Sequence, residues 1–277
     1  MPIRPRHLII GLVILLTVAA CGDDESPGGS DDGDRYTHAT GPTDVVVRIS
    51  YRGGGPPPGS IIDSLGSVPH VVLYGDGTLI MPDYATGALP GLEVYALTGA
   101  GIRMVLEAAD RAGLMDGGMR LGPEGVSDAP YASIRVEAGG QSSATSIVDP
   151  WDEGNADRRR IREFEKRFGD VAGWLGAEAV PVSQGPIDEV IAVFVQLDDP
   201  FSFGAPNYLE WPLDDPGDPA VLPGRYQDEP CLLISGADLD TARAVFAAAD
   251  DNTLWTIGDE IRNIVIRPVY PDGGCGS

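Results

Sequence analysis

Positive charge is scarce in this chain of 277 residues. Lys and Arg number 19 against 42 Asp and Glu, so the formal net charge is −23 at pH 7, and Lys166 is the only lysine. Proteins that bind nucleic acid or adsorb to anionic lipid surfaces use clustered cations. The composition therefore argues against nucleic acid as a partner, and it is typical of a solvated acidic surface.

Cysteine and histidine are also few, with three of each. The usual zinc sites need several Cys or His ligands, so they cannot be assembled from this chain. The acidic loops 198–199 and 214–218 offer oxygen ligands for calcium, but neither fits the EF-hand pattern. We interpret them as solvated loops, and we expect neither a metal nor a cofactor.

A long apolar run is missing as well, because Leu8 to Val18 is too short to span a bilayer. This run follows Arg4 and Arg6 and leads into Val18-Ala19-Ala20-Cys21-Gly22, the pattern of a bacterial lipoprotein signal. We predict a signal peptide over residues 1–20, with export, cleavage and acylation of the Cys21 thiol. The partner is then membrane lipid, and the protein lies at the extracytoplasmic face of the cell membrane.

The segment that begins with the acylated cysteine, residues 21–43, is rich in Asp, Gly and Ser and has almost no large apolar residue. Such a segment cannot recover the entropy that ordering costs. We therefore predict a disordered acidic tether, with His38 as one of its residues.

Two thiols, Cys231 and Cys275, remain once Cys21 is acylated. An even pair outside the cytoplasm is typical of a structural disulfide. A redox pair is the alternative, although the C-x-x-C spacing is absent. Because strands are expected at 231–234 and 264–270, the bridge is easiest if these two strands run antiparallel; residues 271–274 could still rescue a parallel arrangement.

Hairpin patterns alternate with single helical patterns along the rest of the chain, which favours α+β over a βαβ series. We predict two small antiparallel sheet-plus-helix units behind the lipobox signal peptide and the tether. The first unit covers 44–177, with helices at 98–113 and 156–175. A Pro- and Gly-containing linker covers 178–186, and the second unit, closed by the disulfide, covers 187–277.

One predicted helix collects much of the positive charge. Its cations are Arg158, Arg159, Arg160, Arg162, Lys166 and Arg167. One interpretation is a solvated face opposite an apolar stripe at Ile161, Phe164 and Phe168. The other is a docking patch for an acidic protein or polymer of the cell envelope.

Four short stretches and two cysteines carry a resemblance to known sequences. The stretches are Val47-Arg48-Ile49-Ser50-Tyr51-Arg52-Gly53-Gly54, Leu73-Tyr74-Gly75-Asp76-Gly77, Ser127-Asp128-Ala129-Pro130 and Trp211-Pro212-Leu213. Together with Cys231 and Cys275 they resemble a group of uncharacterised lipoproteins from high-GC Gram-positive bacteria. The shared motifs are turns, core strands and cysteines, so the resemblance implies no activity and no catalytic residue.

Catalytic patterns do not emerge from the sequence either. His70 is the only histidine of the predicted folded part, and packing is the simpler role for it; a G-x-S-x-G elbow is absent. Carboxylates are abundant, and a glycosidase needs only two that the fold brings together. Our leading hypothesis is a membrane-anchored, non-enzymatic binding or interaction module of the cell envelope. The alternative is an extracytoplasmic hydrolase, for example on carbohydrate, that uses Asp or Glu side chains.

Overall fold

A computed structural model describes residues 35–52, 68–83, 89, 91–122, 129–152, 154–182, 187–196, 205–250 and 252–276. All of these belong to one compact unit, residues 33–277. The predictions for the signal peptide and for Cys21 lie outside the described residues. Among the helices that are described, none has the length and apolarity needed to cross a membrane.

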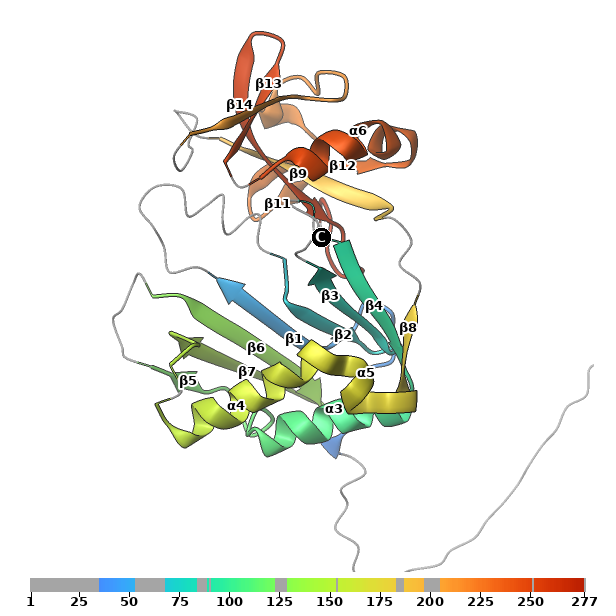
Figure 1. The fold of residues 1–277 in the computed structure, drawn as a ribbon, viewed down its shortest axis with the longest axis vertical. Helices are drawn as coiled ribbons and strands as arrows, with labels where there is room; N and C mark the ends of the chain where they lie inside the picture. Colours follow the sequence, from blue (N-terminus) through green and yellow to red (C-terminus); the bar gives the residue numbers. More distant parts are fainter. Residues whose placement is uncertain are drawn as a thin grey trace, which may run out of the picture. The chain divides into compact units, whose positions relative to one another are not determined.

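The first sheet has eight strands in the order β5-β7-β6-β1-β2-β3-β4-β8 (Figure 1). Neighbouring strands are antiparallel, except that β5 and β7 are parallel. The Asp76–Gly77 turn joins β2 to β3, with Gly77 at φ 92°, a conformation that glycine adopts without steric cost. The bounds are β1 Val45–Arg52, β2 Val71–Tyr74, β3 Thr78–Asp83, β4 Gly91–Leu97, β5 Arg120–Leu121, β6 Tyr131–Ala138, β7 Gln141–Val148 and β8 Ala179–Val182.

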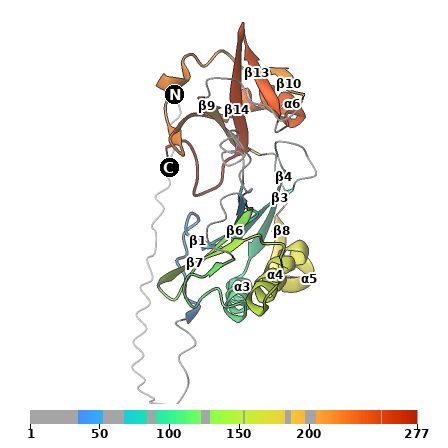
Figure 2. The ribbon, with the colours of Figure 1, turned by 90° about the vertical axis from the view of Figure 1, so that its left-hand side faces the viewer.

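Helices cover one face of this sheet (Figures 1 and 2). Helix α3 (Gly99–Arg111) begins where the Thr98 side chain accepts a hydrogen bond from the Gly101 amide, as an N-cap does. The second predicted helix is divided into α4 (Ala156–Lys166), a 3-10 turn η2 (Arg167–Asp170) and α5 (Val171–Leu175), followed by η3 (Gly176–Glu178). Their apolar sides pack on Val47 and Ile49 of β1 in a single core.

The second sheet has six strands in the order β10-β13-β14-β9-β12-β11. Helix α6 (Gly236–Ala248) packs on one face through an aromatic cluster of Phe194, Trp211, Phe246 and Trp255. The strand bounds are β9 Glu189–Val195, β10 Asn207–Glu210, β11 Arg225–Tyr226, β12 Glu229–Ser235, β13 Thr253–Ile257 and β14 Glu260–Pro268, and a short 3-10 turn η4 covers Pro219–Val221.

The α+β fold class is therefore confirmed, with two sheets and few helices. Most strand pairs are antiparallel, as predicted. The parallel pairs β5–β7 and β10–β13 are the exceptions. Both involve short outer strands that the sequence analysis did not anticipate, and the division into two domains stays a prediction.

Two predicted boundaries differ from the structure. In residues 35–43, assigned to the tether, Arg35 pairs with Asp110 and Asp116. Tyr36 packs against the first core and donates a hydrogen bond to Asp110 at 2.9 Å. The predicted linker begins with Glu178 and then β8, which pairs with β4. Pro181, one of the two prolines that suggested a linker, is tolerated here because β8 is an edge strand.

The Cys231–Cys275 disulfide is confirmed, with 5.7 Å between the two Cα atoms. The antiparallel arrangement expected for the strand that contains Cys231 and the strand that precedes Cys275 was wrong. Strand β9 lies between β12 and β14 and is antiparallel to both. Strands β12 and β14 therefore run parallel to each other. The bridge forms because the residues after β14 carry Cys275 back toward the start of β12.

Candidate functional site

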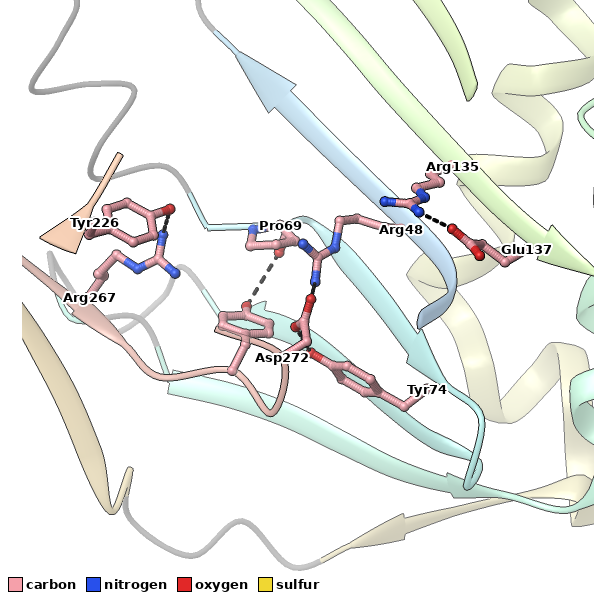
Figure 3. A network of polar contacts seen from close by, with 9 residues as sticks. Arg48, Pro69, Tyr74, Arg135, Glu137, Tyr226, Arg267 and Asp272 are labelled. Carbon is pink, nitrogen blue, oxygen red and sulfur yellow. Dashed lines mark hydrogen bonds and ion pairs between the residues drawn. The ribbon is translucent and has the colours of Figure 1, made fainter. Parts of the chain in front are cut away.

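The chain's C-terminal segment, residues 269–276, makes polar contacts with the first sheet (Figure 3). Asp272 forms an ion pair with Arg48 of β1 and accepts a hydrogen bond from the Tyr74 hydroxyl at 2.5 Å. Tyr270 donates to the Pro69 carbonyl at 3.4 Å. Cys275 follows directly after these contacts, so the disulfide constrains the segment that presents Asp272.

A pocket of about 210 Å³ lies beside these contacts. We call it the arginine pocket and define it by six of its lining residues: Arg48, Ser50 and Arg52 of β1, Tyr226 of β11, Arg267 of β14, and Asp272. Successive side chains of a strand point to opposite faces. Val47 and Ile49 pack in the core on the helix-covered face of β1. The opposite face of β1 therefore carries Arg48, Ser50 and Arg52.

Arg267 is the least expected residue of the pocket. It is only 5% exposed. Its guanidinium lies over the Tyr226 ring, 4.1 Å from the ring centroid, and donates a hydrogen bond to the Tyr226 hydroxyl. Burial lowers the pKa of Arg267, because the cation loses its hydration, and the nearby charge of Arg48 adds to this effect. None of the carboxylates in the described part of the chain forms an ion pair with it.

Hydrogen-bond donors dominate what the pocket offers to a ligand. The Tyr226 hydroxyl accepts from Arg267 and from the Gln227 amide at 3.3 Å. A phenol has two acceptor positions and one proton, so only the donor remains free. The Nε atoms of Arg48 and Arg267 are buried without a partner. Folded proteins pair most buried donors, so these two Nε atoms are unusual among the described residues.

The charge balance of the pocket is opposite to that of the chain. Among the described residues that line it are three guanidinium groups and one carboxylate, Asp272, although acidic residues outnumber basic ones by 42 to 19 overall. Planar guanidinium groups bind carboxylates and phosphates through charge-assisted hydrogen bonds. The arrangement is thus suited to holding a small anion.

One of the six cations of the predicted basic helix, Arg158, does not reach the surface. Arg158 is buried and donates to the carbonyls of Val148 and Asp149, both at 2.8 Å, and of Asp152 at 3.1 Å. It therefore holds the end of β7 and cannot dock a partner, which corrects that part of the prediction. Docking by the remaining five cations stays a prediction.

Three of those five have described partners of their own. Arg160 pairs with Asp157, Arg162 with Glu165 at 3.3 Å, and Arg167 lies over Trp174, 5.4 Å from the ring centroid. These contacts, all within residues 157–174, match the solvated-face interpretation better than a patch directed outward.

A second cluster of titratable groups lies under α4. The His70 ring contacts the Tyr51 ring edge to face, with 5.2 Å between centroids. Burial and the charge of Arg162 lower the pKa of His70. Burial raises the pKa of Glu165, whose Oε1 is buried without a partner. The contact with Tyr51 matches the packing role expected for His70.

The acidic loop at 214–218 uses its carboxylates locally. Asp215 accepts from the Gly217 amide and Asp218 from the Ala220 amide, at 2.8 and 2.9 Å. Within the described ranges, no group of three Cys, His, Asp or Glu side chains is placed to hold a metal ion. The loop at 198–199 lies outside those ranges.

Comparisons of the chain with protein-family models, curated proteins and solved structures found no match. The resemblance to bacterial lipoproteins therefore stays a prediction. The arginine pocket was missed by the sequence analysis. Two signals were available: alternating Arg48, Ser50 and Arg52 in a strand, and a lone charge, Arg267, within the apolar run of β14.

Proposed function

We propose that this protein is a membrane-anchored, extracytoplasmic binding module of the cell envelope that holds a small anionic ligand in the arginine pocket. The observation that carries the proposal is the burial of Arg267 beside Tyr226 without a carboxylate partner among the described residues. Burying an unpaired charge is costly. An anion bound from outside would supply the missing partner.

The anchor is the second part of the proposal and rests on the lipobox pattern at Cys21. The Cys231–Cys275 disulfide supports it, because such bonds persist in oxidising compartments outside the cytoplasm. Membrane lipid would then be one partner, through the acylated cysteine, and the anion the other. Mass spectrometry of the N-terminal peptide from bacterial membranes tests this part; an unmodified Cys21 would contradict it.

The alternative, a hydrolase that uses Asp or Glu, has Glu165 as its best candidate because its pKa is raised. A raised pKa suits a general acid. Glycoside hydrolysis also needs a second carboxylate facing the first. The neighbours of Glu165 in the cluster are Arg162 and Tyr51, so binding is the function that we favour.

The binding proposal is tested by thermal unfolding of the full chain in detergent. Sodium glucuronate and sodium phosphate are compared with sodium chloride at equal ionic strength. Ligand at a hundred times its Kd adds about 2.7 kcal/mol to the free energy of unfolding. We expect at least one of the two anions to raise the melting temperature of the native chain, and Arg267→Gln to abolish this effect.

Two further variants keep this test interpretable. Arg103→Gln removes an exposed arginine of α3 that pairs with Glu107, outside the pocket, so it should respond like the native chain. Arg52→Gln removes the exposed arginine of the pocket and serves if Arg267→Gln does not fold. Stabilisation that is unchanged in both pocket variants would refute the proposal.

A further inference from the structure

We infer that the ligand of the arginine pocket is a polyhydroxy monocarboxylate about the size of one sugar ring, and that Asp272 makes the pocket prefer a single negative charge. This inference rests on the proposed function and names the ligand class of the same site. It is based on which charged side chains of the pocket already pair with each other: Arg48 pairs with Asp272, whereas Arg267 contacts Tyr226 (Figure 3).

Asp272 neutralises one of the cations of the pocket, the partly exposed Arg48. Its carboxylate pairs with Arg48 through one oxygen and accepts from the Tyr74 hydroxyl through the other. The charge of Arg48 is therefore paired within the chain, whereas Arg267 has only a neutral partner, Tyr226, among the described residues. One buried positive charge remains for the ligand. A monocarboxylate balances one charge, and a carboxylate matches the geometry of a guanidinium.

A dianion is disfavoured by the same arrangement. Asp272 itself lines the pocket, so a phosphate dianion would place its second charge near a carboxylate. Like charges brought together in a binding site weaken binding. The remaining cation, Arg52, is exposed, and water screens its contribution.

The size and the lining of the pocket describe the rest of the ligand. A volume of about 210 Å³ equals that of roughly seven water molecules at about 30 Å³ each. Besides the arginines, Ser50, Tyr226 and Gln227 supply polar groups, and the hydroxyl proton of Tyr226 is left to donate. The part of the ligand beyond its carboxylate can accept hydrogen bonds from these donors if it carries several hydroxyl groups, whereas an alkyl chain would leave the donors unpaired.

The test uses three probes with nearly the same ring: D-glucuronate, D-glucose 6-phosphate and D-glucose. Binding to the full chain in detergent is measured by calorimetry at pH 7.5 and constant ionic strength. We expect glucuronate to bind at least about tenfold more tightly than glucose 6-phosphate, and glucose to bind least. Arg267→Gln should weaken glucuronate binding roughly 10- to 100-fold, as loss of a charged hydrogen bond does.

Asp272→Asn is the decisive variant. The amide oxygen can still accept from Arg48 or Tyr74, while the pocket loses its negative charge. We expect affinity for glucose 6-phosphate to rise about tenfold and affinity for glucuronate to change much less. Glu137→Gln is the matched control, because it removes one negative charge from the Arg135–Glu137 pair on β6, which is not among the residues that line the pocket.

Each outcome bears on a different step. If glucose 6-phosphate binds the native chain as tightly as glucuronate, the role of Asp272 is wrong while anion binding stands. That role would also be refuted if Asp272→Asn and Glu137→Gln changed the affinity for glucose 6-phosphate equally. If neither glucuronate nor glucose 6-phosphate binds, but phosphate stabilises the native chain and not Arg267→Gln, the ligand class is wrong. If none of the anions binds or stabilises the native chain, the proposed function itself is refuted.

Discussion

The Tyr74 hydroxyl donates a 2.5 Å hydrogen bond to Asp272, although 198 positions separate the two residues in the chain. Tyr74 ends the buried strand β2, and Asp272 lies in the C-terminal segment that the disulfide constrains. Burial and the Asp272 carboxylate both raise the pKa of Tyr74, so the phenol keeps its proton. The contact joins the first sheet to the C-terminal segment.

Tyr74→Phe removes this hydrogen bond and leaves the ring in place. A hydrogen bond to a charged group contributes about 1.5–3 kcal/mol. We expect the free energy of unfolding to fall by about that amount, measured by denaturant titration. Tyr208→Phe is the control, because Tyr208 is exposed on β10. A Tyr74→Phe chain as stable as the native one would contradict the importance of this contact.

Arg158 and Arg160 lie on the same helix, but we expect very different effects from removing them. Arg158→Gln breaks the buried contacts with three backbone carbonyls at the end of β7, which should cost about 3 kcal/mol or more. Arg160→Gln breaks an exposed pair with Asp157, which should cost less than about 1 kcal/mol. Chemical denaturation of the two variants compares them; equal losses would contradict the structural role of Arg158.

The lowered pKa of His70 predicts a pH dependence of stability. A histidine whose folded pKa lies below its unfolded pKa is harder to protonate in the folded state. The penalty is absent above the unfolded value of about 6.5 and develops fully below the folded value. The native chain should therefore lose more stability between pH 7.5 and pH 5 than His70→Gln does. Thermal unfolding across this range measures the difference, and parallel curves would refute it.

Opening the disulfide should affect stability and ligand binding together. The bridge closes a loop with a sequence separation of 44, for which the chain-entropy model gives about 4 kcal/mol. The double variant Cys231→Ala, Cys275→Ala should lose roughly this much. Because the bridge also holds the segment that presents Asp272, we expect the variant to discriminate less between glucuronate and glucose 6-phosphate. If the folded variant still discriminates between glucuronate and glucose 6-phosphate as the native chain does, the disulfide has no role in positioning Asp272.

Much of the local structure could be predicted because its causes lie within a few residues. The Asp76–Gly77 pair supplies the φ angle of the β2–β3 turn, and Thr98 caps α3 as its position before an apolar stripe indicates. The disulfide was also predictable, since Cys231 and Cys275 are the two cysteines that follow Cys21 in the chain. The α+β class follows from these local patterns.

The pairing of distant segments was decided only by the tertiary structure. Whether β12 and β14 run parallel depends on β9, which lies between them. Whether Arg158 faces solvent depends on where β7 ends, and local helix periodicity does not contain that information. Arg48, Ser50 and Arg52 alternate visibly in the sequence, but Arg267 and Asp272 face them only because the packing of whole sheets brings residues more than 200 positions apart together.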